Sequence, residues 1–103
     1  MHSKDAQMLV LTALAEGPMH GYAVNAAIES LTGARLGAGS LYGALARLEA
    51  RKLIEPAGAH GEEPGRQRTV RITGAGREAL RAELEQMSRV AEAGLRSLGI
   101  APA

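Results

Sequence analysis

Residues 37–52 read Gly37-Ala38-Gly39-Ser40-Leu41-Tyr42-Gly43-Ala44-Leu45-Ala46-Arg47-Leu48-Glu49-Ala50-Arg51-Lys52. Three leucines in this segment are spaced by four and then three residues, so they lie on one face of a helix, which we expect to pack inward. Ser40 directly precedes the first leucine and is predicted to cap the helix, because its hydroxyl can accept a hydrogen bond from a free backbone N–H. The segment therefore predicts a helix over residues 40–52.

The face of this helix opposite the leucines carries small, hydroxyl-bearing or cationic side chains and almost no acid. These residues are Ser40, Tyr42, Gly43, Ala46, Arg47 and Arg51. A helix that buries one side and offers a cationic side open to close approach suits the major groove of DNA. Solvated amphipathic helices share this pattern, and Tyr42 could instead be a core aromatic, so the neighbouring segments decide the interpretation.

A second helix is predicted just upstream, over residues 21–31. Its inward stripe consists of Val24, Ala27, Ile28 and Leu31, and Asn25 and Glu29 are expected on its outer side. Residues 32–37 then form a turn in which Gly33 is the expected left-handed C-cap. Two short helices joined by a glycine-containing turn, with the cations on the second helix, are typical of a helix-turn-helix.

Two short strands are predicted after the cationic helix. Residues 53–55 form the first, and residues 69–72 alternate polar and apolar side chains with a period of two, as expected of the second. The loop between them is polar, so the strands form a hairpin, which we interpret as a two-stranded antiparallel wing over residues 54–72. We expect Arg66 and Arg68 to contact DNA and the two adjacent glutamates of the loop to lean away from it.

Three blocks of sequence resemble the PadR family of bacterial transcriptional regulators. They are Gly17-Pro18-Met19-His20-Gly21-Tyr22, the segment from Gly39-Ser40-Leu41-Tyr42 through Arg47-Leu48-Glu49 to Leu53-Ile54, and the segment from Gly65 to Arg77. The blocks occur in the family's order and cover about residues 8–80. The resemblance implies a winged helix-turn-helix repressor that dimerises through its terminal helices, and it implies that Tyr22 lies against the DNA backbone.

The sequence also departs from the family pattern. Position 43 is often Pro in the family and is Gly43 here, and Thr69 and Val70 replace the aromatic residues that are usual in the wing strand. The chain contains neither Phe nor Trp, so stacking of a planar effector at a dimer interface, a habit of some relatives, is hard to build. A small-molecule effector of unknown identity is therefore left open.

The two terminal helices are the predicted dimer interface. The first helix is expected over residues 4–16 and is apolar nearly all the way round, so we expect a partner subunit to cover one side of it. Burial of this helix in the chain's own core is the alternative.

Thr73 is predicted to cap a final helix over residues 74–98, whose apolar and small side chains recur in the steps of four and three of a coiled-coil seam. The seam could dock on the chain's own first helix, but we expect a second subunit to cover it. The predicted interface comprises Leu9, Leu80, Leu84, Met87, Ala91, Leu95 and Leu98.

The composition is that of one globular domain with an uneven distribution of charge. The chain has 103 residues, of which 46% are hydrophobic, and it contains no Cys, which favours a cytoplasmic location. Its longest apolar run is too short to cross a membrane. Residues 35–77 carry eight basic and four acidic side chains, a formal charge of +4, whereas the remainder carries four basic and seven acidic, a charge of −3. A basic middle between acidic ends fits a single DNA-facing surface.

Residues that could support catalysis or hold a metal are scarce. Asp5 is the only Asp, Cys is absent, and the three His residues lack the i,i+4 spacing of a zinc-binding helix. The glycines of residues 37–43 almost match a dinucleotide-binding loop, but the last one is a position late and no strand precedes the loop. We therefore expect no enzymatic activity, no cofactor and no metal site.

These features predict a mainly α protein with a small two-stranded wing, namely a winged helix-turn-helix over residues 1–73, a dimerisation helix over 74–98 and a frayed tail. We interpret it as a homodimeric repressor that binds double-stranded DNA at a palindromic operator with half-sites one helical turn, ~34 Å, or a multiple of it apart. The predicted DNA-binding residues are Tyr22, Arg35, Ser40, Tyr42, Gly43, Arg47, Arg66 and Arg68. The alternative is a winged-helix adaptor that binds protein, and Arg47 could contact either a base or a phosphate.

Overall fold

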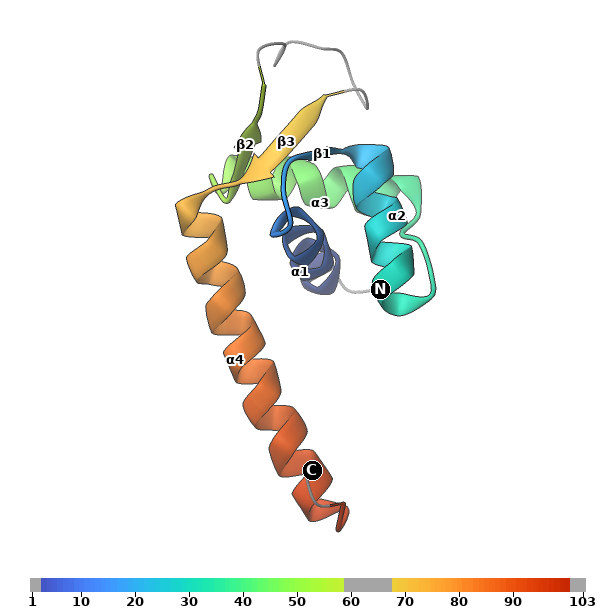
Figure 1. Cartoon of the computed structure of the whole chain (residues 1–103), viewed down its shortest axis with the longest axis vertical. Helices are drawn as coiled ribbons and strands as arrows, with labels where there is room; N and C mark the ends of the chain where they lie inside the picture. Colours follow the sequence, from blue (N-terminus) through green and yellow to red (C-terminus); the bar gives the residue numbers. More distant parts are fainter. Residues whose placement is uncertain (1–2, 59–67, 101–103) are drawn as a thin grey trace.

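The computed structural model describes residues 3–58 and 68–100 and contains four helices and a small sheet within these ranges (Figure 1). In chain order the elements are α1 (Ser3–Leu14), β1 (Met19–His20), α2 (Gly21–Thr32), α3 (Ala38–Ala50), β2 (Ile54–Pro56), β3 (Thr69–Ile72) and α4 (Gly74–Ser97). This is the expected winged helix-turn-helix followed by a long C-terminal helix, so the predicted fold class is confirmed.

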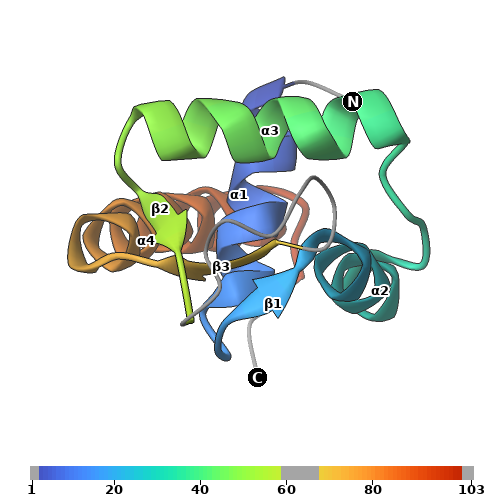
Figure 2. The same ribbon diagram turned by 90° about the horizontal axis from the view of Figure 1, so that it is seen from above.

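The core is built around α1, which packs against α2, α3, β3 and α4. Figure 2 shows α3 crossing α1 along one edge of the molecule, where α3 also contacts α2 and β2. The largest fully buried side chains are Leu14, Ile28, Leu48, Ile54, Val10 and Val24. Much of the apolar surface of α1 is thus buried in the chain's own core, whereas Met8 and Leu9 are only half-buried.

The sheet has three strands in the order β1-β3-β2, in which β2 and β3 form the predicted two-stranded wing and β1 is an additional strand that was not predicted. The missed strand is β1, which pairs antiparallel with β3 so that Met19 lies opposite Val70 and His20 opposite Thr69. On the other edge of β3, Ile54 of β2 lies opposite Ile72. A strand of two residues is too short to show a period of two, and only its long-range pairing reveals it.

Helix α3 begins at Ala38, two residues earlier than predicted, and Ser40 is not its cap. The N-cap is Gly37, which has no side chain with which to cap the helix. Its carbonyl accepts a hydrogen bond from the N–H of Leu41 at 2.9 Å. The reason lies in the preceding turn, where the backbone of Leu36 is bonded to the side chain of Asn25, so the helix can start directly after this anchored residue. Ser40 is therefore an exposed residue of the first helical turn.

The start of α4 is attached to the end of α3 by backbone contacts. Lys52 adopts a left-handed conformation with φ of 61°, which turns the chain so that the N–H of Leu53 donates to the carbonyl of Leu48 at 2.9 Å. The hydroxyl of Thr73 donates to the carbonyl of Lys52 at 2.8 Å and accepts from the N–H of Gly76 at 3.0 Å, which caps α4 as expected. This junction fixes the base of the C-terminal helix against the helix-turn-helix.

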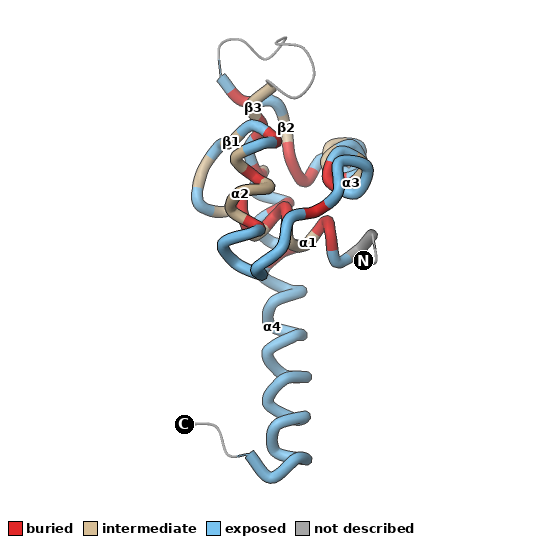
Figure 3. Tube along the Cα trace, turned by 90° about the vertical axis from the view of Figure 1, so that its right-hand side faces the viewer, coloured by how far each residue is buried: buried red, intermediate tan, exposed pale blue. Residues whose placement is uncertain are grey.

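Beyond this base, α4 projects away from the body of the molecule. It has 24 residues and is therefore about 36 Å long. Its buried residues are Gly76 and Leu80, whereas residues 81–100 are exposed, as the pale blue trace of the projecting helix shows (Figure 3). Each helix of the described chain is either too short or too polar to serve as a membrane span.

We predict that Gly76→Ala destabilises the fold by about 1–3 kcal/mol or more, as overpacked core substitutions do. A Cβ at this position would lie 2.1 Å from the carbonyl oxygen of Leu53 and 2.7 Å from a side-chain carbon of Ile72, and backbone atoms cannot easily move aside. Urea unfolding followed by circular dichroism measures the change. Gly74→Ala is the matched control, because a Cβ there meets nothing within 4 Å. Equal stability of the two variants would contradict the close contact.

Candidate nucleic-acid interface

The two faces of α3 are divided as the sequence predicts. Leu41, Ala44 and Leu48 are buried against the core, whereas Tyr42, Ala46 and Arg47 are exposed on the outer side together with Ser40. The small side chains on this outer side leave the helix backbone open to close approach. The arrangement is that of a helix which can enter a groove of the size of the DNA major groove.

Arg47 is the open cation of this face. A Cβ built on Gly43 would lie 3.1 Å from Nη1 of Arg47, so the arginine folds back by one helical turn over the glycine. Its side chain is exposed and has no hydrogen-bond or ion-pair partner among residues 3–58 and 68–100. Gly43 therefore provides space next to a guanidinium group whose donors are not used by any described residue.

Tyr42 lies at the edge of the core and is neither fully open nor a core aromatic. It is 37% exposed, and its ring packs on Gly21, where an added Cβ would lie 3.0 Å from the tyrosine hydroxyl oxygen. Together with Gly21 it lines a small pocket between α3 and β3, whose other lining residues are Leu45, Ala46, Glu49, Arg68 and Val70. The phenol therefore joins α3 to the start of α2.

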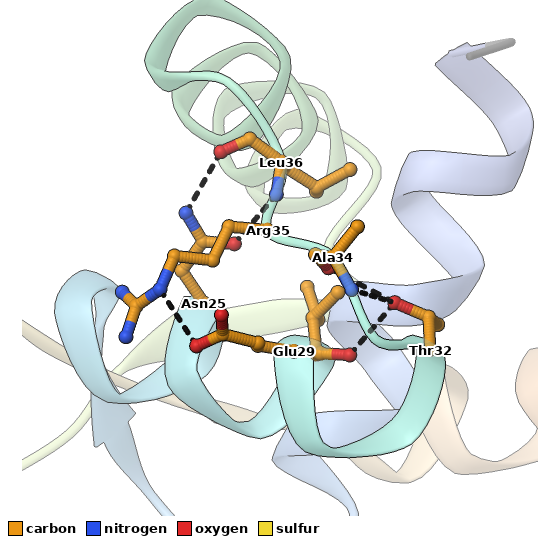
Figure 4. A network of polar contacts seen from close by, with 7 residues as sticks. Asn25, Glu29, Thr32, Ala34, Arg35 and Leu36 are labelled. Atoms are coloured by element: carbon orange, nitrogen blue, oxygen red, sulfur yellow. Dashed lines mark hydrogen bonds and ion pairs between the residues drawn. The ribbon is translucent and has the colours of Figure 1, made fainter.

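Tyr22 and Arg35 are brought together at the edge of the helix-turn-helix. Tyr22 is 67% exposed, and the guanidinium carbon of Arg35 lies 5.3 Å from the centre of its ring, which is within the range of a cation–π contact. Nε of Arg35 also donates to Oε1 of Glu29 at 2.9 Å, as Figure 4 shows. Tyr22 and Arg35, both predicted to contact DNA, are thus neighbours, and Arg35 already has a carboxylate partner.

The turn between α2 and α3 is held by the side-chain amide of Asn25. Nδ2 of Asn25 donates to the carbonyl of Leu36 and Oδ1 accepts from its N–H, both at 2.8 Å (Figure 4). Gly33 is left-handed with φ of 87° and caps α2, as predicted. The sequence pattern instead placed Asn25 on the outside of α2, because an amide that bonds to backbone eleven residues away leaves no periodic signal. Leu31 was expected to face inward but is exposed.

Two arginines were predicted to contact DNA from the wing. Arg68 is already paired with a glutamate, and Arg66 lies outside the described residues. Arg68 forms an ion pair with Glu49 of α3, and both side chains are 33% exposed. Arg66 falls in residues 59–67, which the structure does not describe. Arg51, counted on the outer face of α3, donates from Nη1 to Oε1 of the buried Gln7 at 2.6 Å. Glu49, which was not among the predicted site residues, therefore belongs to the candidate site.

The residues predicted for the dimer seam fall into two groups. Leu80 is 6% exposed and belongs to the core of its own chain, and Leu9 packs against that core. Further along α4 the structure leaves large apolar side chains uncovered, with Met87 46% exposed. These uncovered side chains are Leu84, Met87, Val90, Leu95 and Leu98. Val90 was not among the predicted residues.

The charged side chains of α4 pair along the helix. Arg81 donates to both carboxylate oxygens of Glu78 at 2.7 Å and to Oε2 of Glu85 at 3.2 Å. Hydrogen bonding by Arg81, together with its charge, lowers the pKa of Glu78 below its ordinary value. Among the described residues no cluster of three or more His, Cys, Asp and Glu side chains could hold a metal ion.

We predict that Asn25→Ala destabilises the protein by about 1–3 kcal/mol, because the N–H and carbonyl of Leu36 lose their partners in a half-buried position. Thermal and urea unfolding measure the loss. Glu29→Gln in the same turn is the control, since it removes only an exposed ion pair and should change stability by less than about 1 kcal/mol. Similar losses for the two variants would show that the amide does not hold the turn.

Comparisons with known proteins identify the family. The model of the transcriptional regulator PadR-like family matches residues 10–82. An uncharacterized 37.1 kDa protein in transposon Tn4556 of Streptomyces fradiae is 61% identical over 90 residues, which are 87% of this chain and 25% of that protein. The chain thus spans about a quarter of the length of this relative.

Solved structures agree with the family assignment. A transcriptional regulator from Clostridium thermocellum is similar with a TM-score of 0.72 and 26% identity, covering 88% of this chain and 87% of that one. A PadR-like transcriptional regulator from Bacillus cereus is similar with a TM-score of 0.67 and 25% identity, covering 89% and 88%. The family is one of transcription factors and not of enzymes. The fold, the three ordered sequence blocks and the matched family model show that this chain belongs to the PadR-like transcriptional regulator family.

Proposed function

We propose that the protein is a sequence-specific DNA-binding regulator that acts as a homodimeric repressor at a palindromic operator. The observation that supports this most strongly is the exposed face of α3, which combines small residues with a guanidinium group, Arg47, that has no partner in the described chain. Membership of a transcriptional regulator family supports the same conclusion.

The proposed contacts follow from the position of each side chain. Gly43 and Ala46 let the backbone of α3 approach the base edges, and Arg47 reaches a guanine edge or a phosphate from the same face. Ser40 lies in the first turn of α3, where the helix dipole and free N–H groups favour a phosphate. Tyr22 and Arg35 flank this helix at the start of α2 and the turn, and they would contact the sugar-phosphate backbone.

Dimerisation through α4 is supported by its exposed apolar seam. One recognition helix makes few base contacts, whereas two copies related by a twofold axis would contact half-sites one helical turn, ~34 Å, or a multiple of it apart. Leu84, Met87, Leu95 and Leu98 leave apolar surface in water on a helix that projects from the body of the molecule. Pairing this seam with a second copy would bury that surface.

We predict that Arg47→Ala weakens DNA binding without unfolding the protein, because the side chain is exposed and bonds to none of the described residues. If Arg47 contacts a base, binding to the cognate site alone falls by about 1–3 kcal/mol; if it contacts a phosphate, binding to all sequences falls and the salt slope decreases by ~1. Mobility shift at several salt concentrations measures both effects, beginning with the DNA upstream of the protein's own coding region.

Arg89→Ala is the matched control for this measurement, because Arg89 is an exposed arginine of α4 that is bonded only to Gln86 among the described residues. It should leave DNA binding unchanged. If the wild-type protein bound DNA with no dependence on salt between 50 and 200 mM, or bound none, a protein-binding winged-helix adaptor would replace the proposal.

We predict that Met87→Asp separates the dimer, because it places an unpaired charge in the middle of the α4 seam. Sedimentation velocity should show wild-type dimer and variant monomer at the same concentration. Ala93→Asp introduces the same charge at an exposed position of α4 outside the seam and should remain dimeric. A wild-type monomer at micromolar concentration would contradict dimerisation, and a dimeric Met87→Asp would place the interface elsewhere.

A further inference from the structure

The ion pair between Glu49 and Arg68 joins the recognition helix to the wing. Glu49 lies two residues after Arg47 on α3, and Arg68 directly precedes β3. Both side chains are 33% exposed, and this pair is the least exposed of the Arg–Glu pairs in the described chain. Partly buried charges are screened less by salt than exposed ones, so salt weakens this pair less than the more exposed pairs of α4.

The side of the sheet on which Arg68 lies follows from strand alternation. Arg68 is two residues before the buried Val70, and both line the pocket between α3 and β3, so its side chain faces the recognition helix. Arg71 is exposed and has the opposite parity, and its Nε bonds to Oε2 of Glu55 at 2.8 Å on the other side of the sheet. The two pairs have the same chemistry but only the first adjoins the exposed face of α3.

Resting on the DNA binding proposed above, we infer that Glu49 is a specificity-determining residue that withholds Arg68 from DNA. A carboxylate and a phosphate compete for the same guanidinium donors. Phosphate contacts contribute to binding on every sequence, whereas base contacts contribute only on the operator. Occupying Arg68 with an internal carboxylate therefore lowers sequence-independent binding, while the base-reading face around Arg47 stays open.

The two arginines Arg47 and Arg68 therefore have different roles on the same surface. Arg47 has no partner in the described part of the chain and is free to contact DNA, whereas Arg68 is paired with Glu49 and is kept from DNA. Protein specificity is the difference between two affinities, and it increases when the competing complex is weakened as well as when the correct one is strengthened. In the operator complex the base contacts of α3 fix the register, whereas a non-specific complex can adopt any register that gains a phosphate contact for Arg68. Glu49 therefore weakens the non-specific complex more than the operator complex.

The test is Glu49→Gln, which keeps the shape of the side chain and removes its charge. Affinity for a random-sequence duplex should rise about five- to tenfold at ~0.1 M salt, and the slope of log K against log salt should steepen by about 0.9, as expected for one additional phosphate contact. Affinity for an operator selected from random DNA by the wild-type protein should rise less, so the specificity ratio falls. An unchanged or lower affinity for random DNA would overturn the inference.

Glu55→Gln and the double variant Glu49→Gln/Arg68→Gln separate this mechanism from a general effect of charge. Glu55→Gln removes the same charge on the other side of the sheet and should leave both the affinity and the salt slope close to wild type. The double variant removes both charges of the pair and should bind random DNA within about twofold of wild type with the same slope, because Arg68 was already withheld. The inference would be overturned if Glu55→Gln raised the affinity for random DNA as much as Glu49→Gln does, or if the double variant bound random DNA more weakly than wild type.

The measurements also separate this inference from the proposed function. If the wild-type protein binds DNA and Glu49→Gln binds it equally well, the role of Glu49 is refuted and the proposed function stands. Absence of DNA binding by the wild-type protein and all variants would refute both. Thermal unfolding of each variant confirms that it is folded, and the double variant, which leaves no unpaired half-buried charge, tests the inference even if Glu49→Gln were unstable.

Discussion

The packing of α3 across α1 is the constraint on which the rest of the structure depends. Leu41, Ala44 and Leu48 are buried at this crossing, and burial of a leucine side chain contributes about 1.5–3 kcal/mol relative to exposure. Because the helix has one inward face, burying these residues determines which residues face outward. Arg47 and Ser40 are exposed as a direct result, and no separate interaction is needed to present them.

The sequence predicts what local periodicity and turn chemistry can encode. The leucine spacing identifies the inward face of α3, Gly33 identifies the end of α2, and Thr73 identifies the start of α4, all as the structure has them. The missed strand and the wrong start of α3 share one cause, which is contact between residues that are not close in the chain. The strand β1 exists through pairing with β3, and the start of α3 at Ala38 depends on the amide of Asn25.

The same limit applies to the charges of the candidate site. Counting residues predicts a basic middle segment, but the structure shows that Arg35, Arg68 and Arg71 each have a glutamate partner. Glu49 and Arg68 are 19 positions apart, and no spacing rule links a helix residue to a residue beyond a polar loop. Net charge is therefore a poor guide to which cations can bind a ligand. Arg47, which has no partner among the described residues, identifies such a cation, whereas the net charge does not.

The junction between α3 and α4 connects the two halves of the proposed function. Lys52 and Leu53 follow the end of α3, and their carbonyls accept hydrogen bonds from Thr73, while Gly76 packs against the carbonyl of Leu53 with no room for a side chain. The direction in which α4 leaves the body is therefore fixed by backbone atoms next to the recognition helix. If two copies of α4 pair along the apolar seam, the same contacts set the separation and orientation of the two recognition helices. Half-site spacing is then a property of this junction as much as of the interface, because a rigid base transmits the geometry of the seam to α3 without a flexible linker.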